Sequence, residues 1–196
     1  MKKNILFLLI GLLAFTASFA QTKWEVDPAH TNVVFSVNHL GISFVDGEFT
    51  KLEGNVETTD TENFDNAKIE FAIDANSIHT RVDARDKHLK SDDFFDAEKY
   101  PEITFKNGVL KKKDGNNFSL EGDLTLKDVT KKVSFDIVQN NGVITDPWDQ
   151  TRAGFTGKIK INRMDYNINY DSVLPSGVDE VGKDIEITVN VEIVKK

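Results

Sequence analysis

Residues 185–193, IEITVNVEI, place an apolar side chain at every second position, with polar or charged residues between them. Because successive side chains of a strand point to opposite faces, this alternation predicts a strand with one buried face and one solvated face. The same pattern recurs at residues 68–74, 118–126, 132–137 and 155–162. A chain built from such strands covers its apolar side either by packing two sheets together or by closing one sheet into a barrel.

The number and spacing of the expected strands favour an all-β fold, an antiparallel eight-stranded β-barrel with a short helical segment. Tight-turn sequences such as Asp114-Gly115-Asn116-Asn117 join neighbouring strands, which predicts antiparallel pairing. A barrel of about eight strands has room inside for side chains or one small ligand. A two-sheet sandwich would show the same alternation and stays open as an alternative, while the scarcity of Tyr and Trp disfavours an outer-membrane barrel. The expected strands are 22–26, 32–38, one or two within 43–57, 67–74, 102–106, 109–113, 117–127, 130–140, 151–163 and 183–194.

The one segment with helical features is 80–90. Thr80 and Asp83 have the spacing of a capping box, and the acid-before-base pairs Asp83–Lys87 and Asp86–Lys90 are four residues apart. On such a helix, Arg85 and His88 share one face. The sequence therefore predicts a helix over 80–90, which would place an arginine and a histidine side by side.

The first twenty residues have the features of a secretory signal peptide. Lys2 and Lys3 precede an apolar run, and Ser18 and Ala20 are small residues at the two positions that a signal peptidase reads. We expect cleavage near Ala20, export to the periplasm or secretion, and a single domain over 21–196. The chain contains no cysteine, so disulfides and lipid attachment through cysteine are excluded.

Composition narrows the classes of partner. The formal net charge of −8 disfavours nucleic acid. The fourteen Phe, against three Tyr and two Trp, supply apolar area without a polar group, which suits a dry interior better than a carbohydrate-binding face.

Few residues point to chemistry. The sequence lacks the motifs of common nucleophilic, phosphate-binding and metalloprotease sites. A zinc site from His30, His79, His88 and an Asp has no recognisable ligand spacing, so no metal, cofactor or catalytic residue is predicted. Arginine and histidine donors in the predicted helix would instead suit a phosphate, carboxylate or carbonyl oxygen.

Several blocks of sequence resemble the YceI-like family. They are Trp24-Glu25-Val26-Asp27-Pro28-Ala29-His30-Thr31, the long block 85–96 (RDKHLKSDDFFD), 100–105 (YPEITF) and 122–130 (GDLTLKDVT). The resemblance covers nearly all of 24–196. It departs from the family pattern at a few positions, such as 165–167, where DYN stands in place of the usual DFG.

The resemblance implies an extended lipocalin-like barrel in the periplasm or secreted, which binds polyisoprenoids or other long-chain amphiphiles and carries out no catalysis. It also implies that a homodimer can form, and a lipid cargo is compatible with transient membrane contact. We therefore expect a lipid such as a polyisoprenoid, an isoprenoid quinone or a fatty acid derivative inside the barrel. The protein would be a carrier, a store or a stress-related protein.

The apolar strand faces provide the candidate lining of such a tunnel. Small strand residues, Gly122, Gly154 and Gly157, would leave room within it. We expect His30, Arg81, Arg85 and His88 to lie together near the lipid head group. The expected tunnel residues are Phe35, Val37, Ile69, Phe71, Ile73, Ile103, Phe105, Leu120, Leu124, Leu126, Phe135, Ile137, Phe155 and Ile159.

Two other classes of function remain open from the sequence. One is a hydrolase or isomerase that uses a histidine and a carboxylate inside the barrel. The other is a carbohydrate- or protein-binding module on a β-sandwich with a filled core.

Overall fold

The computed structural model describes residues 21–196. The predicted signal peptide, 1–20, lies outside the described residues. None of the helices within 21–196 has the length and apolarity needed to cross a bilayer. The strands are β1 (Thr22–Val26), β2 (Asn32–His39), β3 (Ser43–Phe49), β4 (Leu52–Thr58), β5 (Lys68–Asp74), β6 (Ile78–His79), β7 (Glu102–Lys112), β8 (Asn117–Leu126), β9 (Val129–Gln139), β10 (Ile144–Thr145), β11 (Thr151–Asn162) and β12 (Val181–Lys195). The helices are α1 (Asp83–Leu89) and the two 3₁₀ turns η1 (Ala75–Ser77) and η2 (Arg163–Tyr166).

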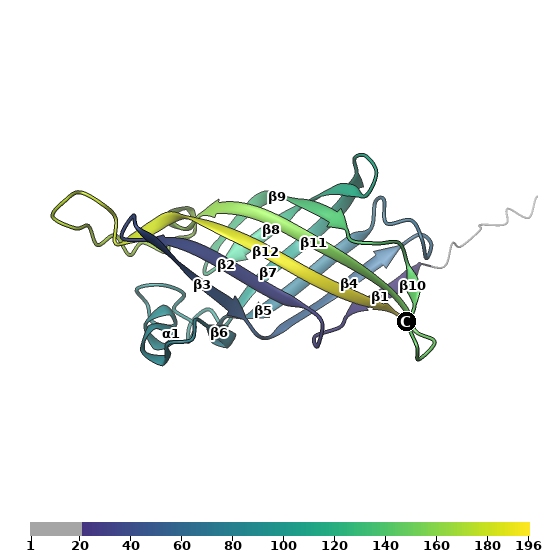
Figure 1. Cartoon of the computed structure of the whole chain (residues 1–196), viewed down its shortest axis with the longest axis horizontal. Helices are drawn as coiled ribbons and strands as arrows, with labels where there is room; N and C mark the ends of the chain where they lie inside the picture. Colours follow the sequence, from purple (N-terminus) through teal and green to yellow (C-terminus); the bar gives the residue numbers. More distant parts are fainter. Residues whose placement is uncertain (1–20) are drawn as a thin grey trace, which may run out of the picture.

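Eight antiparallel strands close into a barrel, which confirms the predicted fold and excludes the sandwich. Around the ring the order is β11, β9, β8, β7, β5, β4, β1 and β12, and the β11–β12 pair closes it. The long strand β12 pairs with β11 on one edge and with both β2 and β1 on the other. Strands β2, β3 and β6 therefore extend the wall at one end, where α1 lies against it (Figure 1).

Two features of the chain differ from the expectation. Residues 102–106 and 109–113 form one strand, β7, because a bulge at Asn107 and Gly108 absorbs the break in alternation. The helix begins at Asp83 rather than Thr80, and its N-cap residue, Val82, makes no capping bond with its side chain. The predicted capping box is therefore wrong, because Thr80 is buried beneath the helix and bonds to Asp86 instead.

One end of the barrel is filled by aromatic side chains. Phe64, from the β4–β5 loop, packs against Trp24 and Phe155, with ring centroids 5.3 and 5.0 Å away. The indole N–H of Trp24 donates to Thr58 Oγ1, so its buried polar atom is satisfied. This end lies beside the C-terminus, and α1 lies at the opposite end (Figure 1).

Candidate functional site

Two neighbouring apolar cavities lie inside the barrel and share part of their lining. The first, of about 80 Å³, lies beneath Phe64, and the second, of about 110 Å³, lies toward α1. Both cavities are lined by Val33, Phe71, Phe135 and Val189, so these four side chains surround their junction. Almost all of the lining is apolar, and an apolar cavity of this kind stays dry.

Most of the predicted tunnel residues line these cavities. Phe71 and Phe135 line both of them. The first cavity is also lined by Ile69, Leu120, Ile137 and Phe155. The second is also lined by Phe35, Val37, Ile73, Ile103, Leu124 and Leu126.

Phe105 and Ile159 line neither cavity. Phe105 is fully buried inside the barrel, where it stacks on Phe71 with ring centroids 4.9 Å apart and does not reach the cavity surface. Its ring fills the space beside Gly122, where an added Cβ would lie 2.4 Å from Phe105 Cζ. The prediction that Gly122 leaves empty space is therefore wrong, whereas Gly157 does line the first cavity. Ile159 packs against the core.

Several lining residues were missed by the sequence analysis. Strand β12 contributes Ile185, Ile187, Val189 and Val191 to the two cavities, and its alternation was the available signal. In the segment that follows α1, the aromatic residues show no alternation that would have predicted their position. Phe94 and Phe95, from this segment, lie over the end of the second cavity.

A buried arginine also lines the second cavity. Arg163 donates from Nε to Gly182 O at 2.9 Å, from Nη1 to Ile168 O at 2.7 Å and from Nη2 to Val181 O at 2.9 Å. Burial lowers the pKa of this guanidinium. These bonds hold the chain on either side of loop 167–180, so Arg163 supports the wall of the cavity.

A hollow of about 160 Å³, lined by both apolar and polar side chains, adjoins the second cavity at the α1 end. We call it the mouth. Its inner wall is shared with the second cavity and consists of Phe35, Val37, Leu89, Phe94 and Val181. Its remaining lining residues are Asn38, His39, Val45, Arg85, His88, Tyr170 and Glu180.

His88 is held in the mouth by an acid and two rings. Its Nε2 lies 2.9 Å from Asp93 Oδ2, and its ring packs edge-on against Phe94 and Tyr170. Tyr170 in turn donates to Glu180 Oε2 at 3.1 Å. Burial, together with this bond to Glu180, raises the pKa of Tyr170, so the phenol stays protonated and can donate.

Arg85 reaches the mouth from α1 because Thr80 holds one side of its guanidinium. Nε of Arg85 donates to Thr80 Oγ1 at 2.7 Å, and Nη2 donates to Thr80 O at 2.6 Å. Asp86 anchors the same residue by accepting from the Thr80 N–H at 2.8 Å and from its hydroxyl. Burial raises the pKa of Asp86, but the hydrogen bonds from Thr80 and His79 outweigh it and leave the pKa below its usual value.

The four predicted head-group residues are not together. Arg85 and His88 line the mouth, as their shared helix face predicted. Arg81 is exposed, at a positive φ of 68°, and lies outside the lining. His30 precedes β2, whereas the mouth contains His39 at the other end of that strand, so placing His30 beside Arg85 and His88 was wrong. His39, Tyr170 and Glu180 were not predicted to lie in the mouth, because residues far apart in the chain carry no spacing signal.

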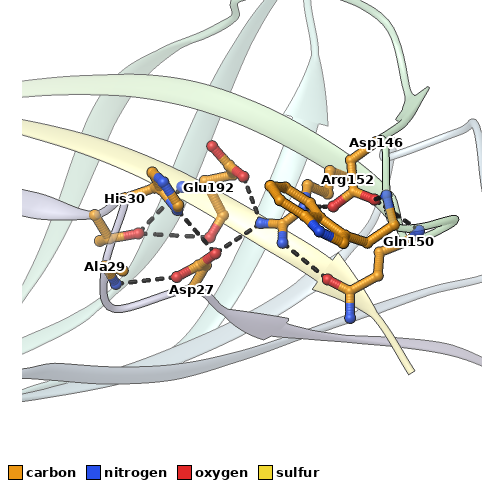
Figure 2. Close-up of polar contacts among 9 residues, drawn as sticks. Asp27, Ala29, His30, Asp146, Gln150, Arg152 and Glu192 are labelled. Atoms are coloured by element: carbon orange, nitrogen blue, oxygen red, sulfur yellow. Dashed lines mark hydrogen bonds and ion pairs between the residues drawn. The ribbon is translucent and has the colours of Figure 1, made fainter.

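His30 belongs instead to an ion-pair cluster around Arg152 (Figure 2). Arg152 Nη1 lies 2.6 Å from both Asp27 Oδ2 and Glu192 Oε1, and its Nε donates to Asp146. His30 Nδ1 lies 3.0 Å from Asp27 Oδ2. The hydrogen bonds from Arg152 and then from His30 lower the pKa of Asp27 to about 2.

Asp27, His30 and Glu192 are close enough together to share a metal ion, but the Arg152 guanidinium already bonds to both carboxylates. The cluster therefore has its own cation and joins the β1–β2 turn to β11 and β12. The three histidines considered for zinc each have a separate acidic partner. The pairs are His30–Asp27, His79–Asp86 and His88–Asp93.

We expect Arg152→Met to lower the melting temperature at neutral pH and to change how it responds to acid. In the native protein the pKa of Asp27 is about 2 against an ordinary 3.8, so its stabilisation is present above pH 3.8 and is lost as the pH falls toward 2. Without the cation, repulsion among Asp27, Asp146 and Glu192 raises their pKa values. The variant should then gain stability when the pH is lowered from about 7 to about 5.

Melting temperatures at low salt, measured by circular dichroism at both pH values, test this prediction. The matched control is Lys160→Met, which removes an exposed cation 3.1 Å from Asp184 and should change little. An Arg152→Met protein with the native melting temperature and the native response to acid would contradict the structural role of the cluster.

Comparison with known proteins supports this architecture. The family model described as "YceI-like domain" matches residues 24–193. The chain belongs to the YceI-like family. Protein YceI of Salmonella arizonae is 35% identical over 199 residues, which covers 100% of both chains.

Solved structures share the barrel. The YceI protein of Campylobacter jejuni is 29% identical, with a TM-score of 0.65 over 81% of this chain and 90% of that one. A polyisoprenoid binding domain from Saccharophagus degradans is 13% identical, with a TM-score of 0.62 over 88% of this chain and 98% of that one, which shows a common fold. The YceI-like fold predicted from the sequence is therefore confirmed.

Proposed function

We propose that the protein binds a long-chain amphiphilic lipid, with its tail in the two neighbouring cavities and its head group at the mouth. The observation that carries this proposal is the order of apolar and polar surroundings along the barrel. Two apolar cavities share Val33, Phe71, Phe135 and Val189 in their lining, and the second adjoins a hollow lined by Arg85 and His88. An apolar tail with one polar end matches that order.

Burial of the tail would supply most of the binding energy. A chain of about sixteen methylenes would gain about 13 kcal/mol gross if it were fully buried, at about 0.8 kcal/mol per methylene. The cavities of about 80 and 110 Å³ are smaller than such a tail, since a cavity of about 150 Å³ holds one benzene, so side chains of the lining must move to admit it. Association costs of about 4–15 kcal/mol offset much of this gain. Affinity therefore depends on how well the tail fills the cavities, and the groups of the mouth set its orientation.

Family membership supports a lipid cargo, and a neighbour with the same fold is described as polyisoprenoid binding. A polyisoprenoid, an isoprenoid quinone and a fatty acid derivative all fit the chemistry of the cavities. We propose that the protein is exported after cleavage near Ala20 and acts as a periplasmic or secreted carrier, store or stress-related protein. The homodimer stays a prediction.

Extraction of the natively purified protein with organic solvent, followed by mass spectrometry, tests the proposal directly. We expect about one long-chain amphiphile for each protein chain. Protein stripped of lipid should then bind an added isoprenoid or fatty acid, measured by the shift in mass under native conditions. Empty extracts, together with no binding of either added lipid, would overturn the proposed function.

The enzyme alternative makes a different prediction. Its best candidate is His88 with Asp93, which lies at the mouth rather than inside the barrel. Catalysis would require turnover of the bound lipid that is lost in His88→Ala while binding persists. We propose binding without turnover, so the extracted lipid should remain chemically unchanged after prolonged incubation with the protein.

A further inference from the structure

Two neighbouring loops beside the mouth carry exposed apolar side chains. In the β2–β3 hairpin Ile42 is 83% exposed and Phe44 is 68% exposed, and in loop 167–180 Val173 and Val178 are also exposed. The loops touch, because Leu40 N donates to Glu180 O at 3.0 Å. Loop 167–180 projects beyond the barrel next to the β2–β3 hairpin, at the end where α1 lies (Figure 1).

The tips of both loops lack charged residues. Residues 40–45 (LGISFV) and 172–178 (SVLPSGV) contain none, in a chain of which 29% is charged. Charged or titratable residues flank each segment, His39 and Asp46 in one case and Asp171 and Asp179 in the other. Uncharged tips with apolar side chains are suited to the boundary between lipid head groups and acyl chains, where charge is costly to bury.

The stems of the same loops line the mouth. Asn38, His39 and Val45 come from the β2–β3 hairpin, and Tyr170 and Glu180 come from the ends of loop 167–180. A surface that receives the loop tips would therefore lie next to the hollow proposed to take the head group. Because the same two loops carry the exposed tips and line the mouth, the tips lie beside the route by which a lipid would enter or leave.

We propose that Ile42, Phe44, Val173 and Val178 insert into the surface of a lipid bilayer and bring the mouth against it for transfer of the cargo. This inference rests on the proposed function and adds the site of membrane contact. The occupant is a bilayer with neutral or zwitterionic head groups, because Asp46 and Asp171 flank the tips and repel an anionic surface, while the third flanking acid, Asp179, is paired with Lys183 at 3.4 Å. Projecting tips fit a deformable lipid surface better than a rigid protein partner.

Flotation with phosphatidylcholine vesicles tests the contact. The purified protein, with its N-terminus checked by mass spectrometry, should float with these vesicles and should float less with vesicles rich in phosphatidylglycerol at low salt. The double variant Ile42→Ser with Phe44→Ser should bind the neutral vesicles at least about tenfold more weakly, since it removes two large apolar side chains from the contact. Its uptake of lipid from those vesicles should slow by a similar factor.

The chain offers a matched control at the other end of the barrel. Ile144 and Trp148, beside the C-terminus, are also exposed, Trp148 to 77%. Ile144→Ser with Trp148→Ser removes a similar apolar area and should leave vesicle binding and lipid uptake unchanged. A second readout is the tryptophan emission of Phe44→Trp in a Trp148→Phe background, which should shift to the blue when neutral vesicles are added.

The outcomes separate this inference from the proposed function. If the protein contains lipid but the tip variant takes it up from vesicles at the native rate, the docking inference is overturned and the cargo proposal stands. If no lipid binds at all, the proposed function itself fails. If the tip variant instead converts a dimer to a monomer by sedimentation, and the native protein does not float, the tips bind a second copy and the inference is wrong.

Discussion

Phe71→Lys is expected to remove at least about nine-tenths of the lipid that co-purifies with the protein. Phe71 lines both cavities at their junction, so a lysine there would place an ammonium group across the path of the tail. A lipid tail at this position would strip the ammonium group of its hydrating water, which costs several kcal/mol. Since a loss of about 1.4 kcal/mol in binding free energy already lowers affinity tenfold, the loss of lipid should be large. Quantitative mass spectrometry of solvent extracts measures the loss.

The matched control is Ala72→Lys, the next residue on β5. Successive residues of a strand point to opposite faces, so the added ammonium lies outside the barrel beside Glu53 and Thr104, its cross-strand partners. This variant should load lipid as the native protein does. Since lysine at position 71 also lowers stability, Val189→Phe provides a second obstruction at the junction without charge. Native loading in a folded Phe71→Lys and a folded Val189→Phe would place the lipid elsewhere.

Alternation was enough to predict strands with one buried face and an all-β fold, because the two faces of a strand are separated by its local sequence alone. A sandwich shows the same alternation, so the barrel was favoured by the number of strands and by the resemblance to the YceI-like family. In β12 the apolar positions of 185–193 all carry side chains of the cavity wall or core. The same reasoning placed Phe71, Phe135 and Leu124 correctly on the inside. It failed at β7, where the bulge at Asn107 and Gly108 shifts the register within a single strand.

Alternation does not say whether an inward side chain faces empty space. Phe105 points inward, but its ring fills the space beside Gly122 and stacks on Phe71. Phe71 lines the cavities and Phe105 does not. Whether an inward side chain lines a cavity or fills space depends on the size of its neighbour on the next strand and on the pairing register. Neither can be read from the residue itself. The sequence therefore predicted an apolar interior without predicting which side chains form its free surface.

The mouth was predictable only where its residues share one local element. Arg85 and His88 lie three apart on α1, so helical spacing placed them together. His39 ends β2 and Tyr170 lies in loop 167–180, and only the closed barrel brings them to the same hollow. His30 lies at the opposite end of β2 from His39, so the closed barrel separates it from Arg85 and His88.

The hydrogen bonds between Asp86 and Thr80 hold the short helix α1 beside the mouth. Of the substitutions considered, the loss of these bonds should lower stability the most. Asp86 is buried and accepts the backbone N–H and the hydroxyl of Thr80. We expect Asp86→Ala to leave both donors without an acceptor and to lower the free energy of unfolding by about 3 kcal/mol. For a chain of this size that corresponds to a fall of about 6–12 °C in melting temperature.

Thr80 also orients Arg85, so the variant should release lipid faster as well as melt earlier. The control is Asp83→Ala, which removes an exposed carboxylate from the same helix and should cost less than about 1 kcal/mol. Because the folded pKa of Asp86 lies below its usual 3.8, its stabilisation exists above that pH and is lost as the pH falls through the folded value. The gap in stability between the native protein and Asp86→Ala must therefore narrow in acid. A gap that stayed constant would show that the carboxylate does not act through its ionised form.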